Sequence, residues 1–202
     1  MGDYILYQPL TRNDRITVML YRAGIALTCI LFAAMAVFFA DSAAIAPPTA
    51  ALLFNIFLSL LYCATGLSVF CIHLYIRKLK TNLIWLYNLA LAGLILFVII
   101  SKGDCLSYFI APGFHLGPIL MLPLAGCIGF IAAKEAVCFR LVEGYLLAML
   151  MPLYLVLLAG GIMGKAAIVS GLVVIAALYL LFTLRKIFMP IHSDIGDKSA
   201  YR

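Results

Sequence analysis

Long apolar runs separated by short polar clusters form the dominant pattern along this chain. About 20 helical residues are needed to cross the roughly 30 Å of hydrocarbon in a bilayer, and six runs come close to that length. The pattern therefore predicts six transmembrane helices, at about residues 16–40, 48–76, 82–100, 115–133, 144–160 and 166–185.

These helices predict the fold class: an all-α integral membrane protein formed by one six-helix bundle. Residues 1–202 then form a single transmembrane domain, with residues 186–202 as its polar tail. The composition agrees, because 66% of the residues are hydrophobic and only 11% are charged, whereas soluble domains have about 45–50% and about 25%. A chain this apolar needs lipid to cover its surface.

The basic residues indicate how the bundle is oriented. Twelve of the fourteen Lys and Arg residues lie in the first segment, in the even-numbered connections or in the tail, and only Lys102 and Lys165 lie on the other side. Because cytoplasmic segments carry an excess of Lys and Arg, we expect both termini in the cytoplasm. The same excess explains the net charge of +6 without a nucleic-acid partner.

A group of charges interrupts the apolar sequence between the fourth and fifth predicted helices: Lys134, Glu135, Arg140 and Glu143. The group is either a solvated or interfacial turn or a polar site held inside the membrane. We favour the turn, because the segment falls on the expected cytoplasmic side and the four charges sum to zero and can pair locally. Few turn-forming residues flank it, so a continuous helix carrying the charges below the membrane surface is the alternative.

The second predicted helix carries a polar stripe. At 100° per residue one side of it collects Asn55, Ser59, Tyr62, Gly66, His73 and Arg77. Unpaired polar groups facing lipid cost several kcal/mol, so this side should face other helices or a wet cavity. Asn88 on the third helix could form hydrogen bonds with this polar side. Hydrogen bonds between helices are the favoured role, with a substrate or proton path and a cofactor pocket as alternatives.

Motifs for catalysis, metals and cofactors are absent from the sequence: there is no GxSxG, GxxxxGK[ST], HExxH or GxGxxG. The six cysteines form no CxxC pair, and the three histidines are expected on different faces. One imidazole would suffice for a haem, but nothing marks such a site. We therefore expect no catalytic residue, metal or cofactor. The remaining candidate cluster of polar residues is His73, Arg77, Lys134, Glu135, Cys138 and Glu143.

Small residues and prolines predict how the helices pack. Ala125, Gly129 and Ala133 recur every fourth residue, a spacing that lets helices approach closely. Pro118 and Pro123 each remove a helix hydrogen bond and predict an interruption of the fourth helix.

Three stretches carry a resemblance to a known family: "HLYIRKL", "KEAVCF…EGY" and the end "RKIFMPIHSDIGDKSAYR". Together they resemble a family of uncharacterised multi-pass membrane proteins of bacteria, including cyanobacteria, from about Tyr21 onward. The resemblance implies the fold and a location in the bacterial cytoplasmic (inner) membrane, or in a thylakoid or other internal membrane. It implies no activity.

The tail is expected to be ordered. Pro190 should end the last helix, and Asp194, Gly196, Asp197 and Lys198 form a turn-like segment. This segment could fold back on Lys134 and Arg140, fold back on the turn at residues 77–80, or bind a partner.

Three functions are consistent with these features. The first is a non-catalytic accessory subunit or assembly factor, whose partners are the lipid bilayer and other membrane-protein subunits. The second is a small-solute or proton-coupled transporter or channel, which requires a water-filled cavity beside Asn55, Ser59 and Tyr62. The third is a membrane-embedded enzyme at the cytoplasmic interface, which requires Glu135 or Glu143 within hydrogen-bonding reach of His73.

Overall fold

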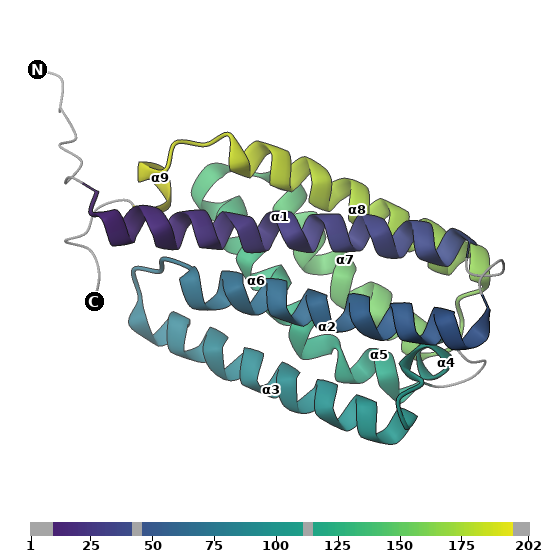
Figure 1. The fold of residues 1–202 in the computed structure, drawn as a ribbon. Coiled ribbons are helices and arrows are strands. Elements are labelled where there is room, and N and C mark those ends of the chain that lie inside the picture. Colours follow the sequence, from purple (N-terminus) through teal and green to yellow (C-terminus); the bar gives the residue numbers. More distant parts are fainter. Residues whose placement is uncertain (1–9, 42–45, 111–114, 196–202) are drawn as a thin grey trace, which may run out of the picture.

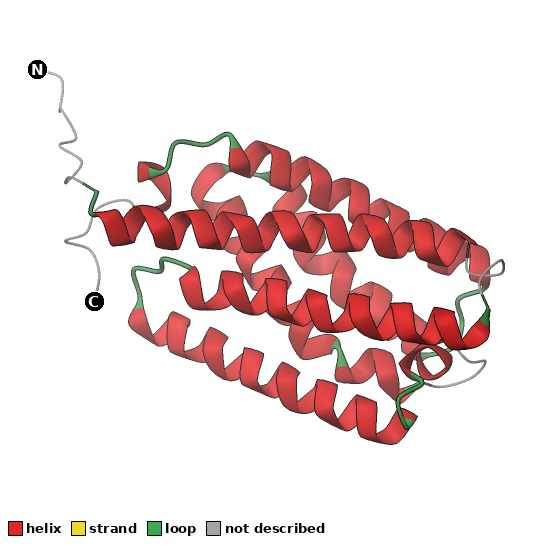
Figure 2. Ribbon diagram, in the orientation of Figure 1, coloured by secondary structure: helices red, strands yellow, loops and turns green. Residues whose placement is uncertain are grey.

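The computed structural model describes residues 10–41, 46–110 and 115–195, and throughout these ranges the regular structure is helical (Figure 2). In the order of the chain the helices of these ranges are α1 Arg12–Asp41, α2 Pro47–Cys71, α3 Arg77–Ser101, α4 Cys105–Ile110, α5 Leu116–Leu120, α6 Leu122–Phe139, α7 Val142–Ala159, α8 Lys165–Ile187 and α9 His192–Ile195.

Six of these helices, α1, α2, α3, α6, α7 and α8, are long and apolar enough to cross a membrane. They run side by side in one bundle (Figure 1), which confirms the predicted six-helix fold class. The start of α1 and the short α9 lie at the same end of the bundle. We call this the basic end, because α3 also starts here with Arg77 and the last turn of α8, which lies here, contains Lys186. That it faces the cytoplasm stays a prediction.

Boundaries of the second, third and fourth predicted spanning helices were wrong. The second helix ends at Cys71, because the backbone turns extended at Ile72 (φ −64°, ψ 136°), and α3 starts at Arg77. The fourth spanning helix starts at Leu122, seven residues later than predicted, because the chain breaks at Met121 between Pro118 and Pro123. The second helix therefore carries neither His73 nor Arg77 on its polar side.

Close helix contacts are made through glycine. A Cβ atom added to Gly24 of α1 would lie 2.7 Å from the Ala64 carbonyl oxygen of α2, and one added to Gly144 of α7 would lie 2.5 Å from that of Ala132 in α6. Both distances are shorter than van der Waals contact, so these helices approach backbone to backbone. Gly129, from the predicted small-residue seam, lies against Ala148 of α7 and serves internal packing.

The short helix α4 covers the end of the bundle opposite the basic end (Figure 1). Its Phe109 packs on Phe54 of α2 and Phe39 of α1, with ring centroids 5.2 and 6.1 Å apart. Such tilted aromatic contacts contribute about 0.5–1.5 kcal/mol each beyond the buried area. This end of the bundle is therefore closed by aromatic side chains.

Candidate functional site: an ion-pair network at the basic end

Lys186, in the last turn of α8, is the centre of a buried group of charges at the basic end. Its side chain is 0% exposed. The ammonium Nζ donates a hydrogen bond to Glu135 Oε2 of α6 at 2.5 Å and another to Asp194 Oδ1 of α9. One cation thus holds two carboxylates that are 51 and eight residues away in the sequence.

Glu135 is also fully buried, and its second oxygen is occupied as well. Oε1 accepts a hydrogen bond from the Tyr21 hydroxyl of α1 at 2.7 Å and one from Lys134 Nζ at 2.7 Å. Charge-assisted hydrogen bonds of this kind are about twice as strong as neutral ones. Glu135 therefore connects α1 and α8 through α6.

Asp194 connects the chain after α8 to α1. Its Oδ2 accepts from Arg22 Nε at 2.8 Å and lies 2.6 Å from Arg22 Nη2. The same guanidinium donates to the backbone carbonyls of Met189 and Pro190, at 2.6 and 3.1 Å. Arg22 thereby fixes the segment between α8 and α9.

We call Tyr21, Arg22, Lys134, Glu135, Lys186 and Asp194 the ion-pair network. It contains three cations and two carboxylates, and each carboxylate has a cation on both sides. Burying a charge costs several kcal/mol unless partners and hydrogen bonds compensate it. Here the compensation comes from four helices, so the charges hold α1, α6, α8 and α9 in register.

A second ion pair lies at the same end of the bundle. Arg185 Nη1, on α8, donates to both oxygens of Glu143 at 2.9 Å each. Glu143 is in the first turn of α7, where the free backbone N–H groups also favour a negative charge. This pair attaches α7 to α8.

The chain does turn at Arg140 and Leu141, between α6 and α7, but the expectation that the charges of this segment are solvated was wrong for both glutamates. Glu135 and Glu143 are 0% and 4% exposed, and their partners Lys186 and Arg185 come from α8 rather than from the segment itself. Only Lys134 and Glu135 pair locally. The connection is short because Arg140 adopts a left-handed conformation (φ 54°), so α7 starts two residues later.

The other candidate residues do not join this network. His73 lies in the connection between α2 and α3, where its Nε2 is 3.3 Å from Thr17 Oγ1 of α1. Arg77 and Cys138 are exposed. The structure thus brings together Lys134 and Glu135, places Glu143 in a neighbouring ion pair, and separates the remaining members of the predicted cluster.

The C-terminal prediction is corrected in part. Asp194 does fold back on the bundle, but onto Lys186 and Arg22 rather than onto Lys134 and Arg140 or residues 77–80. Gly196, Asp197 and Lys198 lie outside the described residues.

The predicted polar stripe does not form one surface. Asn55 Nδ2 donates to the Gly103 carbonyl at 2.6 Å, and the exposed Ser59 donates to the Asn55 carbonyl of its own helix at 2.8 Å. Tyr62 is buried, and its carbonyl accepts from the Tyr87 hydroxyl of α3 at 2.9 Å. Asn88 is exposed on α3 and does not form hydrogen bonds with the polar residues of α2. The Tyr62 hydroxyl itself is buried without a partner among the described residues, and Gly103 lies in the turn after α3. The expected hydrogen bonds between helices are therefore not formed by the side chains of Tyr62, Ser59 or Asn88, and Asn55 bonds to a turn.

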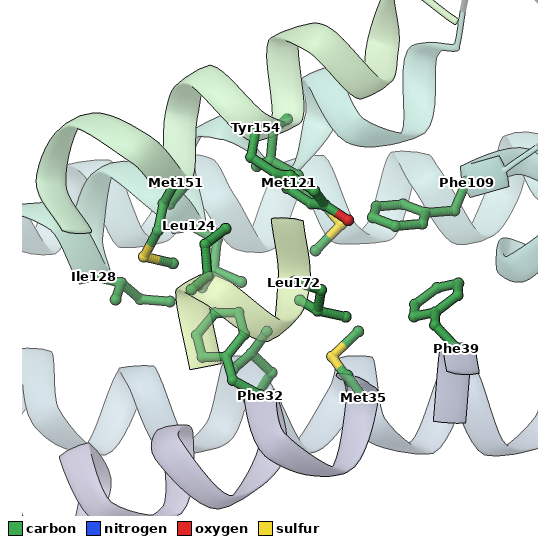
Figure 3. A pocket seen from close by; sticks show the side chains of 14 residues that line it. Phe32, Met35, Phe39, Phe109, Met121, Leu124, Ile128, Met151, Tyr154 and Leu172 are labelled. Atoms are coloured by element: carbon green, nitrogen blue, oxygen red, sulfur yellow. The ribbon is translucent and has the colours of Figure 1, made fainter. Parts of the chain in front are cut away.

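A cavity lies in the middle of the bundle (Figure 3), and its lining is almost entirely apolar. Phe32, Met35, Met121 and Met151 contribute to it, and the hydroxyl of Tyr154 is already bonded to the Ile168 carbonyl. Its volume is about 50 Å³, whereas an engineered apolar cavity known to bind benzene has a volume of about 150 Å³. The cavity is a small packing space rather than a ligand site.

The described residues contain no group of three or more His, Cys, Asp or Glu side chains that could hold a metal ion.

A sequence model of one protein family matches residues 67–202, and that family is described as "Uncharacterized integral membrane protein (DUF2301)". The chain belongs to this family. The match covers more than half of the chain and includes Glu135, Lys186 and Asp194. It starts at residue 67, whereas the resemblance was expected to start at about Tyr21. Membership agrees with the six apolar helices, so the protein is an integral membrane protein in contact with lipid. The bacterial and cyanobacterial origin stays a prediction, and so does the particular membrane. Neither the curated proteins nor the solved structures gave a match.

Protonation of His73 gives a testable pH dependence. Burial lowers the pKa of this ring below its ordinary value, Lys80 and Lys134 lower it further, and Asp14 and Asp194 oppose them. The second ring nitrogen, Nδ1, is buried without a partner in the described part of the chain, so a proton there would lack an acceptor. The unfolded chain then binds more protons than the folded one below about pH 6.5.

We therefore expect the unfolding free energy to fall as the pH is lowered from about 7 through the unfolded pKa, until the folded ring also protonates. Replacement of His73 by glutamine should flatten this part of the curve. The measurement is denaturant unfolding in detergent between about pH 5 and 7.5 for both proteins. Parallel curves for His73→Gln and the wild type would show that His73 does not contribute.

Proposed function

We propose that this protein is a non-catalytic accessory subunit or assembly factor of a larger membrane complex. The observation that carries the proposal is the closed ion-pair network. Lys186 and Glu135 are fully buried, and both oxygens of Glu135 are occupied by Tyr21, Lys134 and Lys186. Charged groups bound in this way hold helices together and are not available to a substrate.

The enzyme hypothesis draws less support from the same geometry. It requires a glutamate within reach of His73, but His73 contacts Thr17, while Glu135 and Glu143 are engaged by cations of α6 and α8. A general base must reach the proton that it abstracts. Cys138, the remaining nucleophile of that hypothesis, is exposed on α6, whereas Glu135 is buried and held by its partners.

The transporter hypothesis also draws less support. It requires a wet cavity beside Asn55, Ser59 and Tyr62, but the cavity between the helices is apolar and is lined by phenylalanine and methionine side chains. Charged residues of transport paths line water or substrate, whereas the charges here face one another.

The proposal is tested by purifying the tagged full-length chain from its native membrane in mild detergent, followed by native mass spectrometry. We expect a particle containing at least one other membrane protein in fixed stoichiometry. Deleting the gene should lower the amount of that assembled partner, as expected for a subunit or assembly factor. A particle containing only copies of this chain, with no change in other complexes after deletion, would contradict the proposal.

A further inference from the structure

Helix α3 is the least covered of the spanning helices. Only 22% of its most apolar stretch is buried inside the protein, against 39% to 56% for the other five candidate spans. It lies at the outer edge of the bundle (Figure 1). One complete side of α3 therefore faces away from the rest of the chain.

The exposed side has a regular spacing. Exposed residues recur at alternating intervals of four and three, and we call them the α3 seam: Thr81, Trp85, Asn88, Ala92, Ile95 and Ile99. This is the a/d spacing of a helix that packs along its length against another helix. Trp85 and Ile99 are 70% and 66% exposed, so the described residues leave most of the seam uncovered.

The opposite side of α3 shows what such a spacing does. Leu83, Tyr87, Ala90, Phe97 and Ser101 each follow a seam residue by two positions, or about 200° around the helix, and all are buried against the bundle. The helix thus carries two seams of the same period on opposite sides. One is packed inside the protein, and the other has no partner in the described chain.

Asn88 distinguishes the α3 seam from an ordinary lipid-facing surface. It is the twelfth of the 25 residues of α3, so it lies close to the middle of the membrane. No hydrogen bond of its side chain is found in residues 10–41, 46–110 and 115–195. A carboxamide has two N–H donors and a carbonyl acceptor, and hydrocarbon satisfies none of them.

A second copy of this chain can supply hydrogen-bond partners for the Asn88 carboxamide, because symmetry places the same residue opposite it. Two copies with the same orientation in a membrane are related by a two-fold axis along the membrane normal, which sets their α3 helices parallel and Asn88 opposite Asn88. Each carboxamide can then donate to the carbonyl of the other. Ala92, one turn away, is small enough to let the two helices approach, as interfaces within membranes require.

We propose that the α3 seam is the interface of a parallel homodimer, with the Asn88 side chains of the two copies hydrogen-bonded to each other near the middle of the membrane. This inference does not rest on the proposed function, because a dimer can form with or without further subunits.

The first experiment is disulfide cross-linking in native membranes. The variant Ala92→Cys should give a covalent dimer on mild oxidation. The matched control is Val174→Cys, because Val174 is also exposed near the middle of a spanning helix but lies on α8. The wild type, with its own six cysteines, gives the background. Cross-linking through Val174→Cys but not through Ala92→Cys would overturn the proposal.

The second experiment measures the dimer constant of the purified full chain in lipid vesicles by single-molecule photobleaching. Asn88→Leu should weaken dimerisation about five- to thirty-fold, the range for a hydrogen bond between membrane helices. Asn82→Leu is the control, since this exposed asparagine lies near the end of α3, where water can reach it. A monomeric wild type, or an Asn88→Leu variant that dimerises like the wild type, would overturn the proposal.

These results are separable from those on function. A dimer that contains no other protein supports the α3 interface and contradicts the accessory role. A complex in which another protein covers α3 contradicts the dimer interface and supports the accessory role.

Discussion

Replacement of Lys186 by methionine should lower the free energy of unfolding by about 3–5 kcal/mol. Methionine keeps most of the apolar part of the side chain but removes the cation that Glu135 and Asp194 share, so these buried carboxylates keep only Lys134 and Arg22 as partners. Breaking a buried ion pair costs more than the pair contributes, because the remaining charge stays desolvated. The measurement is reversible unfolding in detergent, followed by circular dichroism.

Two further variants make this test specific. Lys165→Met removes an exposed lysine at the opposite end of α8 and should change the stability by less than about 0.5 kcal/mol. Combining Lys186→Met with Glu135→Gln should recover part of the loss, because the buried carboxylate that Lys186 held then carries no charge. Asp194 keeps its pair with Arg22, and Lys134 is partly exposed to solvent. Equal effects of Lys186→Met and Lys165→Met would show that the network does not stabilise the bundle.

Replacement of Gly24 by alanine is expected to have the next largest effect, a loss of about 1–3 kcal/mol. The new methyl group would lie 2.7 Å from the Ala64 carbonyl and 2.2 Å from Ser68 Oγ, so α1 and α2 must move apart. The shift also disturbs the hydrogen bond from Ser68 Oγ to the Tyr21 carbonyl. Thermal unfolding in detergent measures the loss.

Gly164→Ala is the matched control for Gly24→Ala. A Cβ atom at Gly164 meets nothing within 4 Å, and its backbone (φ −71°) suits any residue. Alanine should therefore be neutral here, or stabilise slightly by restricting the unfolded chain. If Gly24→Ala is as stable as Gly164→Ala, the close approach of α1 and α2 is not needed for stability.

The fold class could be read from the sequence because the number of spanning helices depends on the length and apolarity of each run alone. Helix ends depend on more. The periodicity of α2 continues to Arg77, and neither glycine nor proline marks Ile72, yet the chain leaves the helix there and buries Ile72 completely. That ending is set by contacts with other helices, which a helical wheel does not contain.

The network was found only in part, because its partners are distant in the sequence. Tyr21 and Glu135 are 114 residues apart, and no local pattern joins them. Lys186 had a signal that sequence reasoning missed. Buried residues of α8 recur at Leu172, Ile175, Tyr179 and Phe182, and the next position on the same side is Lys186. A lysine in that register is expected to face the bundle and to need a carboxylate there.

The position of Asp194 has a consequence for how the protein is made. All six spanning helices precede Asp194 in the chain, so this carboxylate is the last member of the network to leave the ribosome. The last short helix therefore completes the fold, and a chain cut before it keeps an imbalance of charge among its helices.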